Sequence, residues 1–480
     1  MPISIALDLG TTSVRAIAFD VKSEVIAISQ KEIAQHFPKP GWVEHDALEI
    51  LALAEAVLKD VVQAVSPSNI SAIGITNQRE TTVLWNKTTG QPIHNAIVWQ
   101  CRRTADRCTE LQSNAPSIQS KTGLRLDPYF SATKIEWLLD HVPNARAQAD
   151  AGDLLFGTID TWILWNLSQK RVHATDFSNA SRTMLYNIHE QAWDDDLLAL
   201  FNIPSTVLPD VRDSDAHFTD IKIGDQTIPI HAMIGDQQAA LFTQCGEIPG
   251  RFKNTYGTGL FVMTNTGSTP VQTENLITTI AWKRAGTLSY ALEGPIFGGG
   301  SMIQWVRDNL GLISNAQESE ALANSLEDNE GVFFIPALSG LGAPHWTSTK
   351  TGEFKGLTLK TTKSHLVRAV LESIAYQTRE VSDELQTVLS DPPTELYIDG
   401  GATNNTFLMQ FQADVLNMPL NQHQTQESTA LGAAAIAAIA VGEWTEDQFR
   451  SSLSVIKTVT PQPDVATEKQ YQSWKRLLAL

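Results

Sequence analysis

Residues 3–20 read ISIALDLGTTSVRAIAFD, in which two apolar runs flank a short turn of glycine and hydroxyl residues. The runs 3–9 and 14–20 have the length and composition of buried strands, and the turn between them is typical of a hairpin. We therefore predict that the chain opens with two consecutive strands joined by a turn rich in small residues.

The same strand–turn–strand pattern recurs about 250 residues later, where residues 251–263 read RFKNTYGTGLFVM around the turn 257–259. This weak internal symmetry predicts two related α/β domains that face each other. The helix-breaking stretch 246–250, GEIPG, marks the expected boundary, so we expect domains at 1–245 and 246–480. The alternation of strand-like and helix-like segments favours α/β layers over a bundle or a sandwich.

Several other elements can be read from local patterns. Apolar residues at three-to-four spacing predict an amphipathic helix over 47–65, and short apolar runs at 73–75, 232–235 and 396–398 predict buried strands. The alanine-rich run 430–441 is about a dozen residues long, whereas a membrane span needs about 20, so we expect a buried core helix there.

Composition narrows the classes of protein. The chain has 480 residues with 35 Lys and Arg against 53 Asp and Glu, a net charge of −18. Such a surface repels phosphate backbones, so no nucleic-acid partner is expected. Three cysteines make no disulfide framework, and the first residues lack the basic segment of an export signal. We expect a cytoplasmic protein without a membrane span.

The two glycine turns are candidate phosphate-binding loops. Thr11, Thr12 and Ser13 offer hydroxyls beside backbone N–H groups, with Arg15 as a nearby cation, and Thr258 lies in the second turn. Neither turn is a Walker loop or a dinucleotide fingerprint, and each alone also fits a plain hairpin turn. Two such turns in matching positions favour a polyphosphate held between two domains.

Charged residues follow three of the predicted strands. Asp8 and Asp236 stand at strand ends, where ligands bind in α/β proteins, and a carboxylate there fits either a Mg²⁺ ligand, a general base or a capping residue. The pair Arg79-Glu80 suits recognition of vicinal hydroxyls or a surface ion pair. Trp99 fits either a core position or the wall of a site.

Taken together, these motifs resemble the FGGY carbohydrate kinases over nearly the whole chain. The stretches that carry the resemblance occur in order at 8–13 (DLGTTS), 74–82 (GITNQRETT), 96–100 (AIVWQ), 127–131 (DPYFS), 158–162 (TIDTW), 235–240 (GDQQAA), 254–259 (NTYGTG) and 399–402 (DGGA). Residues 129–141 and 352–372 are similar to the two signature patterns of the family.

The resemblance implies two actin-like, ribonuclease-H-like domains with an active-site cleft between them, and ATP-dependent phosphorylation of glycerol to glycerol 3-phosphate. It implies a homo-oligomer and assigns Asp236 as the base and Asp8 as the residue that organises Mg²⁺. Of the two substrates, we expect Arg79 to touch only the triol, with Glu80 as its buried partner. The other implied glycerol contacts are Glu80, Trp99, Tyr129, Gln237 and Phe261, and the implied nucleotide contacts are Thr11, Thr12, Ser13, Arg15, Thr258, Gly300, Gln304, Gly401 and Asn405.

The segment 346–352, WTSTKTG, departs from the family pattern, away from the implied glycerol contacts. Two other functions stay open on the residues: a kinase of another small polyol or of dihydroxyacetone, and a non-catalytic actin-like nucleotide switch. A switch has no use for a triol pocket, so Arg79, Glu80, Tyr129 and Asp236 favour a kinase.

Overall fold

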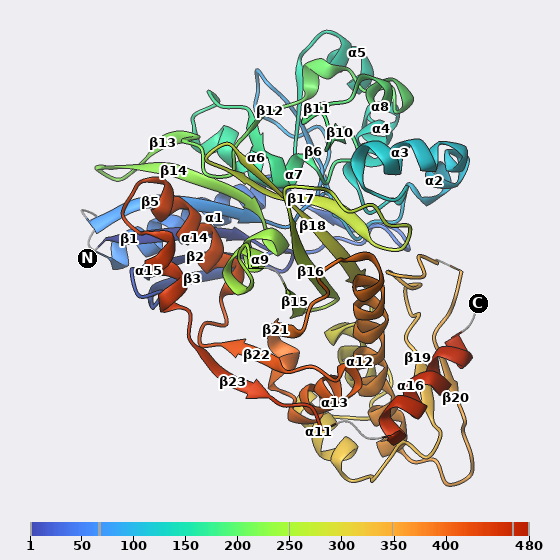
Figure 1. Cartoon of the computed structure of the whole chain (residues 1–480). Coiled ribbons are helices and arrows are strands. Elements are labelled where there is room, and N and C mark those ends of the chain that lie inside the picture. The colour runs from blue at the N-terminus through green and yellow to red at the C-terminus, as the bar shows by residue number, and fades with distance from the viewer. Residues whose placement is uncertain (1, 66–68, 249, 348, 463–464, 479–480) are drawn as a thin grey trace.

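The computed structural model describes residues 2–65, 69–248, 250–347, 349–462 and 465–478. Pro249 in the expected domain boundary and Ser348 in the unusual segment 346–352 therefore lie outside the described residues. The chain folds around two large sheets, one built by each half of the sequence (Figure 1).

The first sheet has six strands in the order β13-β14-β5-β1-β2-β3. Its centre, β1, pairs antiparallel with β2 and parallel with β5, which in turn pairs parallel with β14. In chain order the strands are β1 (Ile3–Leu9), β2 (Ser13–Asp20), β3 (Val25–Glu32), β5 (Ile70–Asn77), β13 (Thr219–Ile223) and β14 (Gln226–Gly235).

The second sheet repeats this arrangement with seven strands in the order β17-β18-β16-β15-β21-β22-β23. Here β15 is the counterpart of β1, because it pairs antiparallel with β16 and parallel with β21. The strands are β15 (Arg251–Tyr256), β16 (Leu260–Gly267), β17 (Ile277–Arg284), β18 (Thr287–Ile296), β21 (Glu395–Asp399), β22 (Leu420–His423) and β23 (Val455–Val459). The predicted α/β class and the pair of related halves are confirmed.

Two helices, α9 (Asp236–Gln244) and α14 (Ser428–Ala440), pack against each other and join the two sheets. Although α14 belongs to the second half of the chain, it lies against β1, β5 and β14 of the first sheet. The contact is close: a Cβ on Gly74 would stand 2.1 Å from the carbonyl oxygen of Ala433, and one on Gly432 would stand 2.1 Å from that of Ala239. The alanine-rich run is thus a buried core helix, as predicted.

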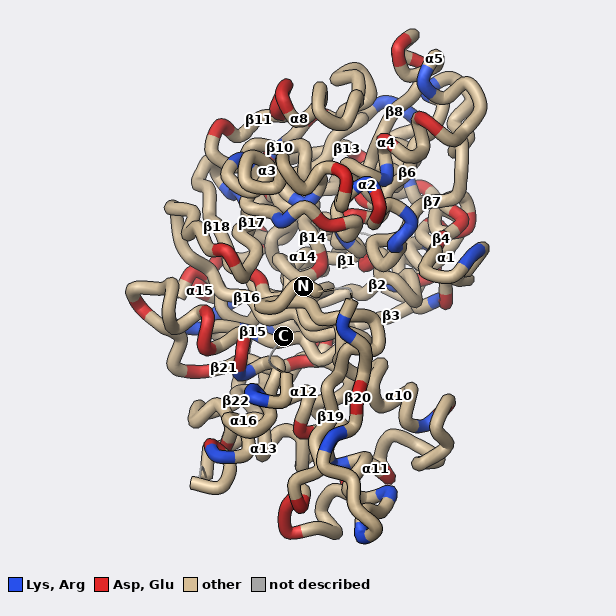
Figure 2. Tube along the Cα trace, turned by 90° about the vertical axis from the view of Figure 1, so that its right-hand side faces the viewer, with Lys and Arg blue, Asp and Glu red and all other residues tan. Residues whose placement is uncertain are grey.

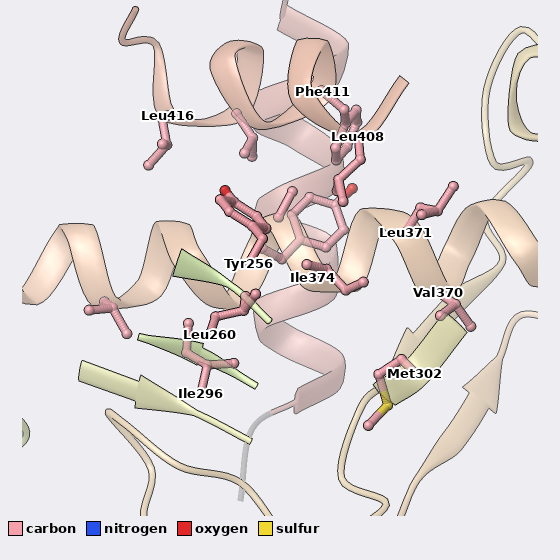
Figure 3. Packing of buried hydrophobic residues seen from close by; sticks show 14 of the residues in the cluster. Tyr256, Leu260, Ile296, Met302, Val370, Leu371, Ile374, Leu408, Phe411 and Leu416 are labelled. Carbon is pink, nitrogen blue, oxygen red and sulfur yellow. The ribbon is translucent and has the colours of Figure 1, made fainter. Parts of the chain in front are cut away.

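Each half also has its own core. On the other face of the first sheet, α1 (Ala47–Ala64) and α6 (Ile159–Leu167) bury apolar residues. In the second half, β15, β16 and β18 pack against α10 (Gly300–Asp308), α12 (Lys363–Val388), α13 (Thr406–Leu416) and α16 (Val465–Leu478). Figure 3 shows this packing around Tyr256, with Leu260, Ile296, Ile374 and Leu408 beside it.

The remaining elements form peripheral layers. Between β3 and β13 the chain builds β4 (Glu44–His45), β6 (Val83–Asn86), β7 (Ala96–Ile97), α2 (Ala105–Glu110), α3 (Ala115–Thr122), α4 (Ser131–His141), α5 (Ala145–Asp150), β8 (Leu154–Gly157), β9 (Ala174–Asp176), α7 (Phe177–Ala180), β10 (Tyr186–Asn187), β11 (Ala192–Trp193), α8 (Asp195–Leu200) and β12 (Asp210–Arg212). The second half adds α11 (Ala316–Asn324), β19 (Phe333–Ile335), β20 (Glu353–Lys355) and α15 (Glu446–Ser452).

The locally predicted elements are confirmed with small shifts at their ends. The predicted helix over 47–65 ends at Ala64, and the strand expected at 73–75 runs over the longer range of β5. Ser13, assigned to the first turn, is already the first residue of β2. No helix in the described part of the chain is long and apolar enough to cross a membrane. Basic positions are scattered among acidic ones over both halves (Figure 2).

Candidate active site

The carboxyl ends of three parallel strands meet at one edge of the first sheet. The pairing places Leu9 of β1 opposite Asn77 of β5, and Asn77 opposite Gly235 of β14. Residues that leave these strands therefore start from neighbouring points. This register brings together Asp8, the pair Arg79-Glu80 and Asp236, although they are far apart in the sequence.

A cavity of about 300 Å³ lies at this edge. Its lining residues come from both halves of the chain, so it lies between the two sheets. Ten of the residues singled out in the sequence line it: Thr11, Thr12, Arg79, Glu80, Trp99, Tyr129, Asp236, Thr258, Phe261 and Gln304. Gln35, Gln100 and Gly259 also line it and were not assigned from the sequence.

A second cavity of about 340 Å³ adjoins the first, since Thr258 and Gln304 line both. It lies within the second half, between the turn after β15, the start of α10 and the start of α13. Gly300, Gly401 and Asn405 line it, as do the apolar side chains of Ile303, Leu371 and Leu408. The two cavities are of similar volume, and Thr258 and Gln304 stand at their common border.

Glycine allows the close packing that shapes the second cavity. The backbone N–H of Gly300 donates to the carbonyl oxygen of Gly257 at 2.8 Å, and a Cβ on Gly300 would stand 2.8 Å from the same oxygen. Gly400 has φ of +93°, and a Cβ there would stand 2.5 Å from the carbonyl oxygen of Tyr256. Any side chain at these two positions would push the loops apart.

Three aromatic rings form the apolar wall of the first cavity. The ring of Trp99 lies 5.6 Å from that of Tyr129 and 6.0 Å from that of Phe261, measured between centroids, in edge-to-face arrangements. The indole N–H of Trp99 donates to Oγ1 of Thr11 at 2.9 Å. The aromatic wall is therefore fixed to the first glycine turn.

Asp236 is the first residue of α9 and its side chain remains 27% exposed. One carboxylate oxygen, Oδ1, accepts from the backbone N–H of Gln237 at 2.7 Å and lies 3.2 Å from Nε of Arg79. Burial raises the pKa of Asp236 above its ordinary value, while Arg79 opposes that rise. A carboxylate with this access to the cavity can accept a proton from a bound hydroxyl.

The pair Arg79-Glu80 is not a surface ion pair, because both side chains are almost fully buried. Their direct contact is weak, with Nε of Arg79 4.0 Å from Oε1 of Glu80. The guanidinium of Arg79 also bonds to Glu293 and Gln238, two partners that the sequence did not indicate. Each member of the pair has a stronger partner elsewhere in the fold.

Asp8 lies at the end of β1, paired with Arg15, which also contacts Oε2 of Glu427 at 2.5 Å. Burial raises the pKa of Asp8, and Arg15 opposes that rise. Both contacts from Arg15 fall on Oδ2 of Asp8. Within the described residues Oδ1 has no hydrogen-bond partner, and no group of three or more metal-ligating side chains occurs.

Comparison with known proteins places the chain in a family. The model of the N-terminal domain of the FGGY family of carbohydrate kinases matches residues 3–243, and that of the C-terminal domain matches residues 252–441. The chain belongs to the FGGY family of carbohydrate kinases. The predicted family and the predicted two-domain fold are thereby confirmed.

The relatives of this FGGY kinase extend over its whole length. It is 48% identical over 482 residues to a glycerol kinase of Shewanella frigidimarina, and the aligned region covers 99% of this chain and 97% of that protein. It is 50% identical to one of Stenotrophomonas maltophilia with the same coverage. The crystal structure of Plasmodium falciparum glycerol kinase with ADP has a TM-score of 0.91 at 35% identity, covering 100% of this chain and 98% of that one.

Four of the residues that the sequence assigned to the site of this FGGY kinase line neither cavity: Asp8, Ser13, Arg15 and Gln237. The amide of Gln237 is fixed by a buried lysine, because its Oε1 accepts a hydrogen bond from the ammonium of Lys253. The same ammonium donates to Oγ1 of Thr255 at 2.9 Å. Burial lowers the pKa of Lys253 to about 8. Asn405 also caps α13, since its side chain accepts from the backbone N–H of Leu408 at 2.9 Å.

The sequence did not single out the buried charges Lys253, Arg182 and Glu293 of the FGGY kinase. One of the three had a weak local signal, because Glu293 interrupts the largely apolar strand segment 290–296. A charged residue inside such a strand needs a partner of opposite charge or a polar cavity. The pattern indicates that a partner exists but does not say which residue it is.

Proposed function

We propose that this FGGY kinase transfers the γ-phosphoryl group of ATP to glycerol and releases sn-glycerol 3-phosphate and ADP. The observation that carries the proposal is the first cavity, which holds the partly exposed carboxylate of Asp236 and adjoins a second cavity formed by the other half of the chain. The glycerol kinases named above, 48% and 50% identical over nearly full length, support the choice of substrate.

The polar and apolar sides of the first cavity suit a triol. Arg79 donates hydrogen bonds, Glu80 accepts them, and the Tyr129 hydroxyl does either, which matches three hydroxyl groups on a short carbon chain. Trp99 and Phe261 cover the C–H face and exclude water. We propose Gln237 as a further contact, with its amide held by Lys253.

In the reaction, Asp236 takes the proton of the attacking hydroxyl while that oxygen bonds to the γ-phosphorus and the bond to the β-phosphate oxygen of ATP breaks. Little covalent chemistry is asked of the protein, so the positions of the reacting groups matter most. The walls that exclude water from the cavity also prevent transfer of the phosphoryl group to water.

We propose that ATP occupies the second cavity with its phosphates directed to the two glycine turns. Thr258 and Gln304, which line both cavities, stand where the γ-phosphate would reach the first one. The other proposed nucleotide contacts are Thr11, Thr12, Ser13, Arg15, Gly300, Gly401 and Asn405. Hydroxyls and backbone N–H groups are suitable donors to phosphate oxygens.

The residues present fit a Mg²⁺ ion that accompanies the nucleotide. Mg²⁺ is commonly held by one or two carboxylates together with phosphates and water, and Asp8 presents a carboxylate oxygen that Arg15 leaves free. When bound, the ion would neutralise phosphate charge. Arg15 and Glu427 keep the Asp8 carboxylate in place.

The direct test is ADP formation measured with glycerol, dihydroxyacetone, glyceraldehyde and a pentitol as acceptors. We expect glycerol to give the highest kcat/KM. A higher value for dihydroxyacetone would reassign the acceptor. Equal ATP consumption with and without glycerol would instead indicate a nucleotide switch.

We further propose a homo-oligomer in the cytoplasm. The edge strand β3 exposes Val25, Ile26 and Ile28 by 46%, 48% and 52%, an apolar edge that a second copy can cover. The three cysteines are buried and free, as expected in a reducing compartment. Light scattering after gel filtration gives the oligomeric state, and a monomeric mass would contradict the proposal.

A further inference from the structure

Four charged side chains form a closed buried group behind the first cavity: Arg79, Glu80, Arg182 and Glu293. We call them the charge ring. Their side chains are at most 2% exposed. Only Arg79 and Glu80 line the cavity, and the other two lie behind them.

Glu293 holds the guanidinium of Arg79 in a fixed plane. Its Oε2 lies 2.7 Å from Nη1 of Arg79 and its Oε1 lies 2.9 Å from Nη2, the two-pronged geometry that fits an arginine best. The same two oxygens lie 3.1 and 3.2 Å from Nη1 and Nη2 of Arg182. Burial alone would raise the pKa of Glu293, but Arg182 and Arg79 together lower it to about 2.

Arg182 fixes Glu80 in a similar way. Its Nε donates to Oε1 of Glu80 at 2.6 Å. The backbone of Glu80 is held too: its φ is +61°, and its carbonyl oxygen accepts from the hydroxyls of Thr82 and Ser131 at 2.9 and 3.0 Å. Glu80 therefore has little freedom at either end.

The charge ring joins the two halves of the chain. Arg79 follows β5, and Arg182 follows α7, both in the first half, while Glu293 belongs to β18 in the second. Two arginines and two glutamates balance each other in charge, which makes their burial tolerable. Removing one carboxylate would leave two guanidinium groups facing each other.

We propose that Glu293 and Arg182 are positioning residues of the substrate site: they hold Arg79 and Glu80 in the geometry that binds the acceptor. This inference rests on the proposed phosphorylation of glycerol. An unrestrained arginine or glutamate loses rotamer freedom when it binds a ligand, and the charge ring removes that freedom beforehand. The acceptor site is complete only when β18 of the second half supplies Glu293.

The test is steady-state kinetics of Glu293→Gln with glycerol and ATP each varied. The substitution keeps the shape of the side chain and removes its charge. We expect the KM for glycerol to rise ten- to hundredfold while the KM for ATP stays within twofold. Glu293→Asp, which keeps the charge, is the second variant and should retain more affinity for glycerol than Glu293→Gln.

The matched control is Glu372→Gln. Glu372 is also fully buried and pairs with Arg368 at 2.7 Å, but neither lines the two cavities. We expect this variant to lower the melting temperature without changing either KM. A loss of stability alone therefore does not imitate the expected result for Glu293.

A double-mutant cycle checks the role of Arg182. If Arg182 acts through Glu80, then Arg182→Lys should raise the KM for glycerol when it is introduced into the wild-type protein. The same substitution should change that KM little when it is introduced into the Glu80→Gln variant. Independent effects that multiply in the double variant would overturn the assignment of Arg182.

The outcomes separate the two proposals. Wild-type protein that forms ADP independently of glycerol contradicts the proposed function, and the positioning roles fall with it. Suppose instead that the wild-type protein is active on glycerol. The positioning roles alone are then contradicted if Glu293→Gln and Glu293→Asp each change the KM for glycerol and the KM for ATP by the same factor, or if they change neither KM.

Discussion

The carboxylate of Glu293 binds both terminal nitrogens of Arg79, 214 residues away in the chain. Arg79 lines the cavity between the two halves, whereas Glu293 does not. The group expected to bind the substrate thus takes its orientation from a strand of the other half. Geometry of this kind is the main contribution that a protein makes to phosphoryl transfer.

Asp236→Asn should lower kcat by about 10²- to 10⁴-fold, because an amide cannot accept the proton of the attacking hydroxyl. The KM for ATP and the melting temperature should change little. The measurement is coupled ADP formation, with Asp225→Asn in the exposed turn between β13 and β14 as the control. Activity within a few-fold of the wild type would remove Asp236 from the mechanism.

Arg79→Ala should raise the KM for glycerol far more than that for ATP and also lower the melting temperature. The second effect arises because Glu293 loses its two-pronged partner, and breaking a buried ion pair typically costs about 3–5 kcal/mol. Kinetics and thermal unfolding should be measured on the same preparation. An unchanged melting temperature would contradict this account of the pair.

Gly300→Ala should raise the KM for ATP about tenfold, a loss of about 1.4 kcal/mol. The added methyl group would stand 2.8 Å from the carbonyl oxygen of Gly257 and displace the turn that separates the two cavities. The KM for glycerol serves as the internal control and should stay within a few-fold. If it rises as much as that for ATP, the turn shapes both cavities.

Gly74→Ala should destabilise the protein by about 3 kcal/mol or more, since the new Cβ would stand 2.1 Å from the carbonyl oxygen of Ala433. Gly152→Ala is the control: it has open space but a φ of +72°, and should cost about 1 kcal/mol. The loss of stability in each variant is measured as the decrease in its melting temperature relative to the wild type. Equal shifts would show that β5 and α14 adjust to each other.

Lys253 should make stability depend on pH in the alkaline range. Its folded pKa is about 8, against 10.5 for the free side chain, so between these values the unfolded chain binds the proton more strongly. Stability due to this group therefore rises with pH from 8 to 10.5, by up to about 3 kcal/mol. The charged groups that act on it are Asp399, Arg79, Asp236 and Glu293.

The measurement is the difference in melting temperature between the wild type and Lys253→Met at pH 7 and pH 10. We expect the melting temperature of the wild type, relative to that of the variant, to be higher at pH 10 than at pH 7. A difference that does not change with pH would show that Lys253 is neutral or charged in both states alike.

Local patterns in the sequence predicted much of the fold. The hairpins β1–β2 and β15–β16 need only a turn between adjacent apolar runs, and both occur where they were expected. The alanine-rich composition of 430–441 predicted burial correctly, because small apolar side chains suit close packing. The order of the motifs also indicated the FGGY family, which its domain models confirm.

The tertiary structure alone decided which charges meet. Glu293 is visible in the sequence as a charge within a largely apolar stretch, whereas Arg182 and Lys253 stand in the polar stretches 178–183 and 251–256. The partners of all three lie on segments that only the parallel register of β1, β5 and β14 and the joining of the two halves bring near. The burial of Arg79-Glu80 has the same origin. Turn residues and apolar periodicity act over a few residues and leave a local trace in the sequence, whereas an ion pair across 214 residues depends on the packing of both sheets and leaves none.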